Sequence, residues 1–220
     1  MDILNTKFEY LIKKIENIKK PNILELGVNK GRSTKIFLNL CDRNDGRLVS
    51  VDIIDCRKVS DNPKWKFIHS SDDNFELINE YLKKPLDVLY IDSLHEASHV
   101  KKVLYNYYDF LKDGGLCFID DISWLPYIKD KKKENSYMEE TNFRIFNKVL
   151  EIHDSNSESF FLEFFFEGSG YAIITKRNRN KLNQEKKISI NKLSLKNFLK
   201  KIYLKKPVRW TVTSSIIFPT

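Results

Sequence analysis

Short apolar runs alternate along the chain with longer stretches in which apolar residues recur at helical spacing. The first helical stretch covers residues 3–20, and the first apolar run, Ile23 to Leu26, follows Pro21. This alternation is typical of a parallel sheet whose strands are connected by helices. The predicted strands are residues 22–27, 47–53, 66–69, 86–92 and 116–119. The predicted helices between them are residues 31–41, 75–82 and 100–111.

The pattern changes in the last third of the chain. Residues 124–140 are charged and aromatic without periodicity, which predicts a long loop of the kind that forms lids. A helix over 140–152 follows, and two apolar runs, 160–166 and 171–175, flank a Gly-Ser-Gly turn that predicts a β-hairpin. Together these elements predict an α/β fold: a Rossmann-like, seven-stranded, mostly parallel sheet with helices on both faces and an antiparallel C-terminal hairpin.

Composition indicates one globular domain. The chain has 220 residues, of which 41% are hydrophobic and 31% charged, which is enough to bury a core. Its three cysteines are scattered and form no C-x-x-C pair, which argues against a disulfide framework and favours a reducing, cytoplasmic location. No apolar run approaches the roughly 20 residues of a membrane span, and the first residues do not resemble a signal peptide.

Positive charge is concentrated at the C-terminal end. Residues 176–220 hold thirteen Lys and Arg against one Glu, a net charge of +12, so the other residues carry −4 of the total +8. We therefore expect a domain over 1–175 and a basic appendage over 176–220. Leu195, Phe198 and Ile202 predict an amphipathic helix in the appendage. Such a helix either packs on the domain or contacts an acidic partner or an anionic membrane surface, and no stacking motif favours nucleic acid.

A glycine turn follows the first predicted strand. Gly27 and Gly31 enclose three residues, Glu25 precedes them, and Ser33 is placed to cap the next helix. A dinucleotide site would need a further glycine, and the carboxylate of Glu25 would repel a pyrophosphate. A ligand with a cationic end, such as S-adenosylmethionine (SAM), suits this turn better. Asp52 ends the second strand, where an acidic residue can hold the two hydroxyls of a ribose.

Acidic residues also follow the fourth and fifth strands. Asp92 and then His95 come after the fourth strand, and Asp120 and Asp121 end the fifth. Neighbouring strands lie about 5 Å apart, so these carboxylates should converge. They would repel one another unless a proton or cation lies among them, and carboxylate oxygens favour Mg²⁺, Mn²⁺ or Ca²⁺. Such a cation could hold two substrate hydroxyls and lower the pKa of one of them.

Two stretches resemble a known family. E-L-G-x-x-x-G-x-S, after the first strand, resembles the first motif of class I SAM-dependent methyltransferases. I-D-x-x-H, a helix, and then L-K-x-G-G-x-x-x-x-D-D resemble the metal-dependent O-methyltransferases that act on the sugars of macrolide and aminocoumarin antibiotics, and small methyltransferases of polysaccharide gene clusters. The resemblance covers about residues 21–175. The matching residues are Glu25, Gly27, Gly31, Ser33, Asp52, Asp92, His95, Gly114, Gly115, Asp120 and Asp121.

The resemblance implies a SAM-dependent O-methyltransferase, assisted by Mg²⁺ or another hard divalent cation, with a hydroxyl of a sugar, glycan or other small molecule as acceptor. The residues that it implies for SAM are Glu25, Gly27, Gly31, Ser33, Asp52, Ser71, Asp72 and Asp92, with Ser71 or Asp72 beside the adenine or capping a helix. The residues that it implies for the metal are Asp92, Asp120 and Asp121. His95, with Asp92, is then the catalytic pair, because an imidazole titrates near neutrality. Many relatives carry Gly-Asp where this chain has Ser93-Leu94.

Other interpretations stay open at this point. A degenerate methyltransferase fold could serve as a binding or assembly module, and an RNA methyltransferase would need the appendage to bind RNA. The N-P-P-[YF] motif of amino-group methyltransferases is absent after the fourth strand. The string from His95 to His99 fits the zinc motif H-E-x-x-H, but it begins a helix directly after a strand, whereas zinc proteases carry the motif in mid-helix. The acceptor and a homo-oligomeric state also stay open.

Overall fold

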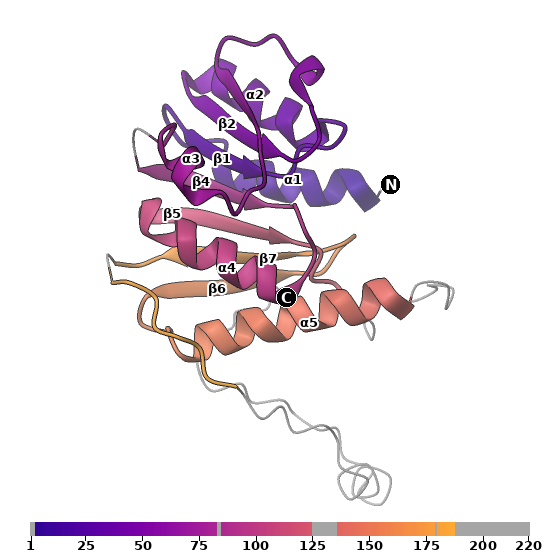
Figure 1. The fold of residues 1–220 in the computed structure, drawn as a ribbon, viewed down its shortest axis with the longest axis vertical. Helices are drawn as coiled ribbons and strands as arrows, with labels where there is room; N and C mark the ends of the chain where they lie inside the picture. The colour runs from indigo at the N-terminus through magenta and orange to yellow at the C-terminus, as the bar shows by residue number, and fades with distance from the viewer. Residues whose placement is uncertain (1–2, 83–84, 125–135, 179, 188–220) are drawn as a thin grey trace, which may run out of the picture.

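The structure is a computed structural model that describes residues 3–82, 85–124, 136–178 and 180–187 (Figure 1). One seven-stranded sheet forms its centre, in the order β3-β2-β1-β4-β5-β7-β6. The strands are β1 (Asn22–Leu26), β2 (Arg47–Asp52), β3 (Trp65–His69), β4 (Leu86–Ile91), β5 (Leu111–Asp120), β6 (Phe160–Phe165) and β7 (Tyr171–Lys176). The helices are α1 (Ile3–Ile15), α2 (Arg32–Asn44), α3 (Phe75–Asn79), α4 (Ala97–Tyr107) and α5 (Ser136–Asp154), with 3-10 turns at Arg57–Val59 and Tyr108–Phe110.

The topology confirms the predicted Rossmann-like fold. The first five strands pair in parallel, and β7 lies antiparallel to both β5 and β6. Strand β1 lies between β2 and β4, so the chain reverses its direction of growth across the sheet at this point. In open α/β sheets, ligands bind outside the carboxyl ends of the strands at such a reversal.

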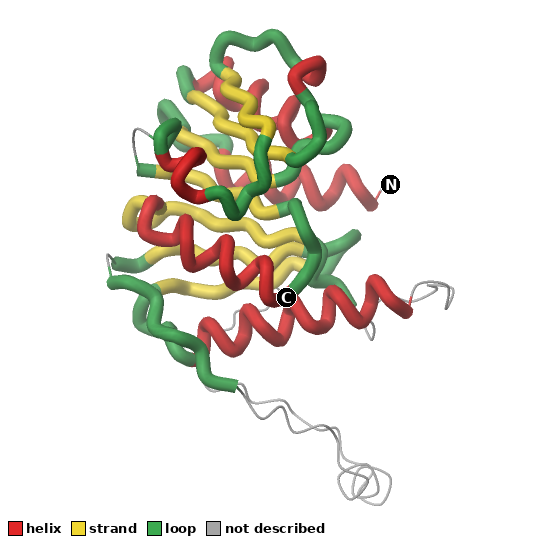
Figure 2. The backbone as a smooth tube through the Cα atoms, viewed as in Figure 1, coloured by secondary structure: helices red, strands yellow, loops and turns green. Residues whose placement is uncertain are grey.

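Helices cover both faces of the sheet, as Figures 1 and 2 show. On one face, Leu11 and Ile15 of α1 and Phe37 of α2 are fully buried in one hydrophobic cluster with strand residues. On the other face, Val103 of α4 and Val149 of α5 belong to a second buried cluster. Because both faces are covered, the central strands are almost continuously apolar, as parallel strands are in general.

Some boundaries differ from those predicted. Helix α1 ends at Ile15 and not near residue 20; Lys20 has a positive φ of 50°, and Asn44 Nδ2 donates to the carbonyl oxygens of Glu16 and Ile18 beyond the helix end. Strand β5 begins at Leu111 and not at residue 116, because residues 112–115 form a bulge within a longer strand. Helix α5 begins at Ser136, inside the predicted loop over 124–140, of which residues 125–135 lie outside the described part.

The first residues of the basic appendage lie against the domain. Strand β7 runs to Lys176, one residue past the predicted domain boundary. Glu185, whose side chain is 8% exposed, forms ion pairs with Lys101 of α4 and Lys148 of α5. The predicted amphipathic helix of the appendage lies outside the described residues. None of the helices that the structure describes combines the length and the apolar composition needed to cross a membrane.

Candidate active site

A cavity of about 410 Å³ lies at the carboxyl ends of β1, β2 and β4, at the predicted edge of the sheet. The predicted site residues that line it are Gly27, Asp52, Ser71, Asp72, Asp92 and His95. The predicted residues that do not line it are Glu25, Gly31, Ser33, Asp120 and Asp121. About half of the site residues predicted from the sequence therefore line one cavity, and the other predicted residues do not.

The two glycines of the turn allow close packing at the ends of β1 and α2. Gly27 has a φ of +96°, and a Cβ atom there would lie 2.0 Å from the carbonyl oxygen of Asp92. Gly31, with a φ of +72°, is the N-cap residue of α2, and a Cβ atom would lie 2.1 Å from a methyl group of Val59. The prediction that Ser33 caps α2 is therefore wrong, since Gly31 takes that position and Ser33 lies inside the helix.

Glu25 lies behind the glycine turn and is fully buried. Its carboxylate accepts hydrogen bonds from the hydroxyls of Ser33 (2.5 Å), Thr34 (2.8 Å) and Ser50 (2.6 Å). Burial raises the pKa of Glu25 to about 7, although the three hydrogen bonds favour its charged form. These hydrogen bonds connect α2 to β1 and β2, and the contact of Glu25 and Ser33 with SAM stays a prediction.

Replacing Glu25 with glutamine should change the pH dependence of stability. The pKa of Glu25 is about 7 in the folded chain against 4.5 for an ordinary glutamate, so the folded state keeps its proton to a higher pH than the unfolded state does. The resulting stabilisation is complete below pH 4.5 and is lost as the pH rises to about 7, by up to about 3 kcal/mol. Urea unfolding of the wild type and Glu25→Gln should therefore diverge over this interval. A constant difference between the two proteins would contradict the raised pKa.

Asp52 organises the rim of the cavity. Its Oδ2 atom accepts hydrogen bonds from the backbone N–H groups of Val28 (2.7 Å) and Asn29 (2.9 Å) in the glycine turn. Its Oδ1 atom accepts from the N–H of Ile54 at 2.8 Å. Asp52 therefore fixes the loops that follow β1 and β2, and it remains in the cavity wall, where the sequence placed a ribose contact.

Asp72 and His99 form a second group in the cavity wall. The carboxylate of Asp72 accepts a hydrogen bond from Ser93 and contacts His99 Nε2 at 2.9 Å. Neither Ser71 nor Asp72 is the N-cap residue of α3, which is Asn74, so of the two alternatives given for these residues the capping role is wrong. Because His99 contacts Asp72 and His95 faces other carboxylates, the two histidines of the H-E-x-x-H string do not converge.

The predicted meeting of Asp92, His95 and Asp121 is present. The Nε2 atom of His95 lies 3.4 Å from Asp121 Oδ2 and 3.8 Å from Asp92 Oδ1. Burial, followed by the negative charge of Asp120, raises the pKa values of both Asp92 and Asp121 above the ordinary range. Asp121 has a φ of +59°, a backbone conformation that is uncommon for a residue with a side chain and that recurs at functional sites.

Asp120 is held by a residue that sequence reasoning missed. Lys7 of α1 forms a buried ion pair with Asp120, and the two side chains are each 4% exposed. Asp120 also accepts hydrogen bonds from Tyr90 Oη (2.8 Å) and Ser169 Oγ (2.9 Å). Burial opposes the charged form of Asp120, but the ammonium and hydrogen bonds of Lys7, with those of Tyr90 and Ser169, hold its pKa below the ordinary value.

The predicted three-carboxylate metal site does not fit this arrangement. The position beside Asp120 that a divalent cation would need is taken by the ammonium of Lys7, which also contacts Ser169 and lies 4.4 Å from the centre of the Tyr171 ring. Within the described ranges, no group of three or more His, Cys, Asp or Glu side chains is arranged to hold a metal ion. Asp92 and Asp121 remain beside His95, without Asp120 as a third ligand.

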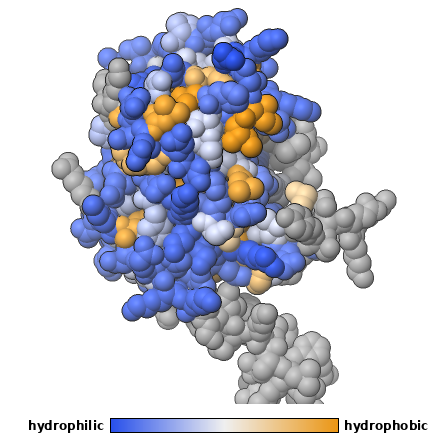
Figure 3. Space-filling model, in the orientation of Figure 1, coloured by the Kyte–Doolittle hydropathy of each residue, from blue (hydrophilic) through white to orange (hydrophobic). Residues whose placement is uncertain are grey.

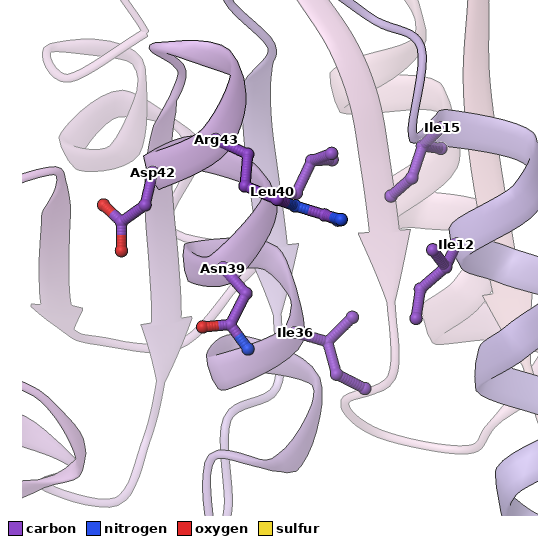
Figure 4. Close-up of a pocket in the computed structure, with 7 residues that line it drawn as sticks. All are labelled: Ile12, Ile15, Ile36, Asn39, Leu40, Asp42 and Arg43. Atoms are coloured by element: carbon purple, nitrogen blue, oxygen red, sulfur yellow. The ribbon is translucent and has the colours of Figure 1, made fainter.

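Two surface features complete the surroundings of the cavity. Large apolar side chains at its rim are exposed, namely Ile53 (71%), Ile54 (61%) and Leu94 (52%), and Figure 3 shows hydrophobic patches on an otherwise hydrophilic face. A separate cleft of about 460 Å³ lies between α1 and α2 (Figure 4). Ile12 of α1 and Arg43 of α2 line it, and α2 ends near Arg43, at the opposite edge of the sheet from the cavity.

Comparison with known proteins agrees with this geometry. Residues 24–122 match the profile of a family described as a methyltransferase domain. No curated protein is significantly similar to the chain in sequence. The matched residues include the glycine turn, Asp52, Asp92, His95 and both acids at the end of β5, so the region that carries the cavity is the region that resembles a methyltransferase domain.

Solved structures share the fold at low sequence identity. The methyltransferase MycE of the mycinamycin pathway, solved with Mg and SAH, has a TM-score of 0.59 and 14% identity over 80% of this chain. The match covers 51% of MycE, so the chain spans about half the length of that relative. A candidate caffeoyl-CoA O-methyltransferase from Staphylococcus aureus has a TM-score of 0.59 and 20% identity over 80% of this chain and 84% of its own. A candidate rRNA methylase from Clostridium thermocellum has a TM-score of 0.60 and 16% identity over 82% and 98%.

Proposed function

We propose that this chain is a SAM-dependent methyltransferase that transfers the methyl group of SAM to a hydroxyl of a small-molecule or glycan-type acceptor. The observation that carries the proposal is the position of His95 in the lining of the cavity, with its Nε2 atom near Asp92 and Asp121. An imidazole held by carboxylates is suited to accept a proton from a hydroxyl. SAH-bound MycE and the O-methyltransferase-like neighbour from Staphylococcus aureus support the same class of reaction.

The proposed reaction balances with the residues in this cavity. SAM bound in the cavity would supply the methyl group: the acceptor oxygen would form a bond to the methyl carbon, the bond from that carbon to sulfur would break, and SAH would leave. The hydroxyl proton passes to His95 through Nδ1, because Nε2 faces the two carboxylates. The resulting imidazolium lies 3.4 Å from Asp121 and 3.8 Å from Asp92, and its positive charge favours the ionised forms of these two acids, whose pKa values are otherwise raised.

We further propose that the transfer does not depend on a divalent cation at Asp120. MycE was solved with Mg, but here Lys7 supplies the positive charge that balances the buried carboxylate. The residues that would remain for a cation are Asp92, Asp121 and His95, and the proposed chemistry assigns them to the proton.

The test is calorimetric titration with SAM and SAH, followed by transfer of labelled methyl groups to sugars, aromatic diols and RNA. We expect binding of both ligands and alkali-stable methyl ethers on a hydroxyl acceptor, at equal rates with EDTA or Mg²⁺. Absence of SAM binding would favour a binding or assembly module. Methylation of RNA bases alone would overturn the choice of a hydroxyl acceptor.

Replacing His95 with asparagine should lower kcat by about 10²-fold, the usual contribution of a general base. The affinity for SAM should change by no more than about twofold, because His95 borders the cavity without being required to shape it. A matched control is His69→Asn, since His69 lies on β3 and contacts the Ile53 carbonyl oxygen through Nε2. Equal losses of kcat in the two variants would remove His95 from the chemistry.

A further inference from the structure

His95 borders a second hollow besides the cavity. A cleft of about 490 Å³ opens between the first turn of α4 and the N-terminal part of α5. His95, Glu96 and Ser98 line it on one side, and Glu140, Thr141 and Arg144 of α5 line it on the other. Since His95 is the residue that the cavity and this cleft share, a molecule in the cleft would meet the methyl donor at that side chain.

We propose that this cleft is the acceptor site and that it binds a non-aromatic, polyhydroxylated molecule of the sugar class. The inference rests on the proposed methyl transfer and names where its acceptor lies and what recognises it. This assignment accounts for the position of His95 between the cavity and the cleft: SAM would occupy the cavity, and the acceptor in the cleft would present its hydroxyl to His95.

The chemistry of the lining matches many hydroxyls. Glu96 and Glu140 supply only acceptors, Arg144 supplies only donors, and Ser98 and Thr141 supply both. A sugar hydroxyl both donates and accepts, so neighbouring hydroxyls can bond to a carboxylate and a guanidinium at the same time. The volume of the cleft lies within the range of about 300–1,000 Å³ that is typical of small-molecule sites.

The charged groups of the cleft are available to a ligand. Arg144 Nη2 lies 2.5 Å from Glu140 Oε1, one turn away on α5, and both side chains are well exposed, at 67% and 62%. Exposed pairs of this kind contribute little to stability, so exchanging part of the pair for ligand hydroxyls costs little. Glu96 is also exposed, at the N-cap position of α4.

The nearby aromatic residues do not form the cleft. Trp124 packs on Phe143 (centroids 4.4 Å apart) and on Phe146 (6.0 Å), and Phe146 packs on Phe164. Apart from the imidazole of His95, no ring among the described residues lines the cleft. A flat aromatic acceptor would therefore lack a stacking partner there, whereas a sugar does not need one.

The test uses the full chain saturated with SAH, and saturation-transfer NMR with methyl α-glucopyranoside, methyl β-glucuronide and catechol as probes. We expect signals from at least one sugar probe and weaker ones from catechol. Arg144→Ala and Glu96→Gln should each weaken sugar binding by about tenfold, the value of one hydrogen bond to a charged group. Arg43→Ala, which removes an arginine from the cleft between α1 and α2, is the matched control and should change nothing.

A calorimetric titration of each variant with SAH separates the two proposals. Unchanged SAH affinity with lost sugar binding in Arg144→Ala and Glu96→Gln supports the acceptor cleft. Unchanged SAH affinity with equal sugar binding in all variants, or with catechol as the preferred probe, overturns the cleft and leaves the methyltransferase proposal standing. Failure of the wild type to bind SAH overturns the proposed function and the cleft with it.

Discussion

Replacing Lys7 with methionine should lower the free energy of unfolding by about 3–5 kcal/mol, the usual cost of breaking a buried ion pair from one side. Methionine is close to lysine in length and can still pack on Tyr171, so the main loss is the charge. Asp120, which is 4% exposed, would then be buried near Asp92 and Asp121 without the ammonium. Urea unfolding at neutral pH measures the change directly.

Two variants test whether the ion pair causes this loss. Lys14 lies on α1 like Lys7, and its ion pair with Glu163 of β6 is partly exposed. Lys14→Met removes this pair and should cost less than about 1 kcal/mol. The double variant Lys7→Met with Asp120→Asn should recover much of the stability, because it removes both charges. A cost for Lys7→Met no larger than that for Lys14→Met would refute the role of Lys7.

Replacing Gly27 with alanine should lower the free energy of unfolding by about 3–5 kcal/mol and weaken SAM binding by at least about a hundredfold. The added Cβ atom would lie 2.0 Å from the carbonyl oxygen of Asp92 and 2.6 Å from its carbon, so the ends of β1 and β4 must separate. The φ of +96° adds a conformational cost for any residue with a side chain. Both ends line the cavity, so calorimetry with SAM should report their separation.

Gly114→Ala is the matched control for this variant. Gly114 also has a positive φ, of +76°, but a Cβ atom there would have no neighbour within 4 Å. Gly114→Ala should therefore lower the free energy of unfolding only by the cost of the positive φ, about 1–2 kcal/mol, and leave the affinity for SAM unchanged. Equal effects of Gly27→Ala and Gly114→Ala would show that the contact with Asp92 does not matter.

Much of the site could be predicted because strand ends are readable from local sequence. Apolar runs of five or six residues end in Asp52, Asp92 and Asp120, and a parallel sheet brings such ends to one edge. The approach of His95 to Asp92 and Asp121 follows from the same rule. The partners of individual side chains at that edge were not predictable in this way. Glu25 accepts hydrogen bonds from three hydroxyl groups behind the glycine turn, and His99 contacts Asp72.

Lys7 shows most clearly why the remainder was missed. It lies 113 residues from Asp120 in sequence, and no local pattern links a first helix to the end of the fifth strand. One signal was present, because Lys7, Leu11 and Ile15 are spaced by four residues and so share one face of α1. Leu11 and Ile15 are fully buried. A lysine on such a face needs a buried anion as its partner.

The origin of Lys7 in α1 affects how relatives of this chain should be sorted. The methyltransferase family profile begins at residue 24, so the region used to recognise the family excludes the helix that neutralises Asp120. Two proteins could therefore match that profile equally well, with identical acids at the ends of β4 and β5, and still differ in whether the third carboxylate is free. A basic residue on the buried face of the preceding helix would mark the self-neutralised type, and an apolar residue there would mark the type with an open cation position.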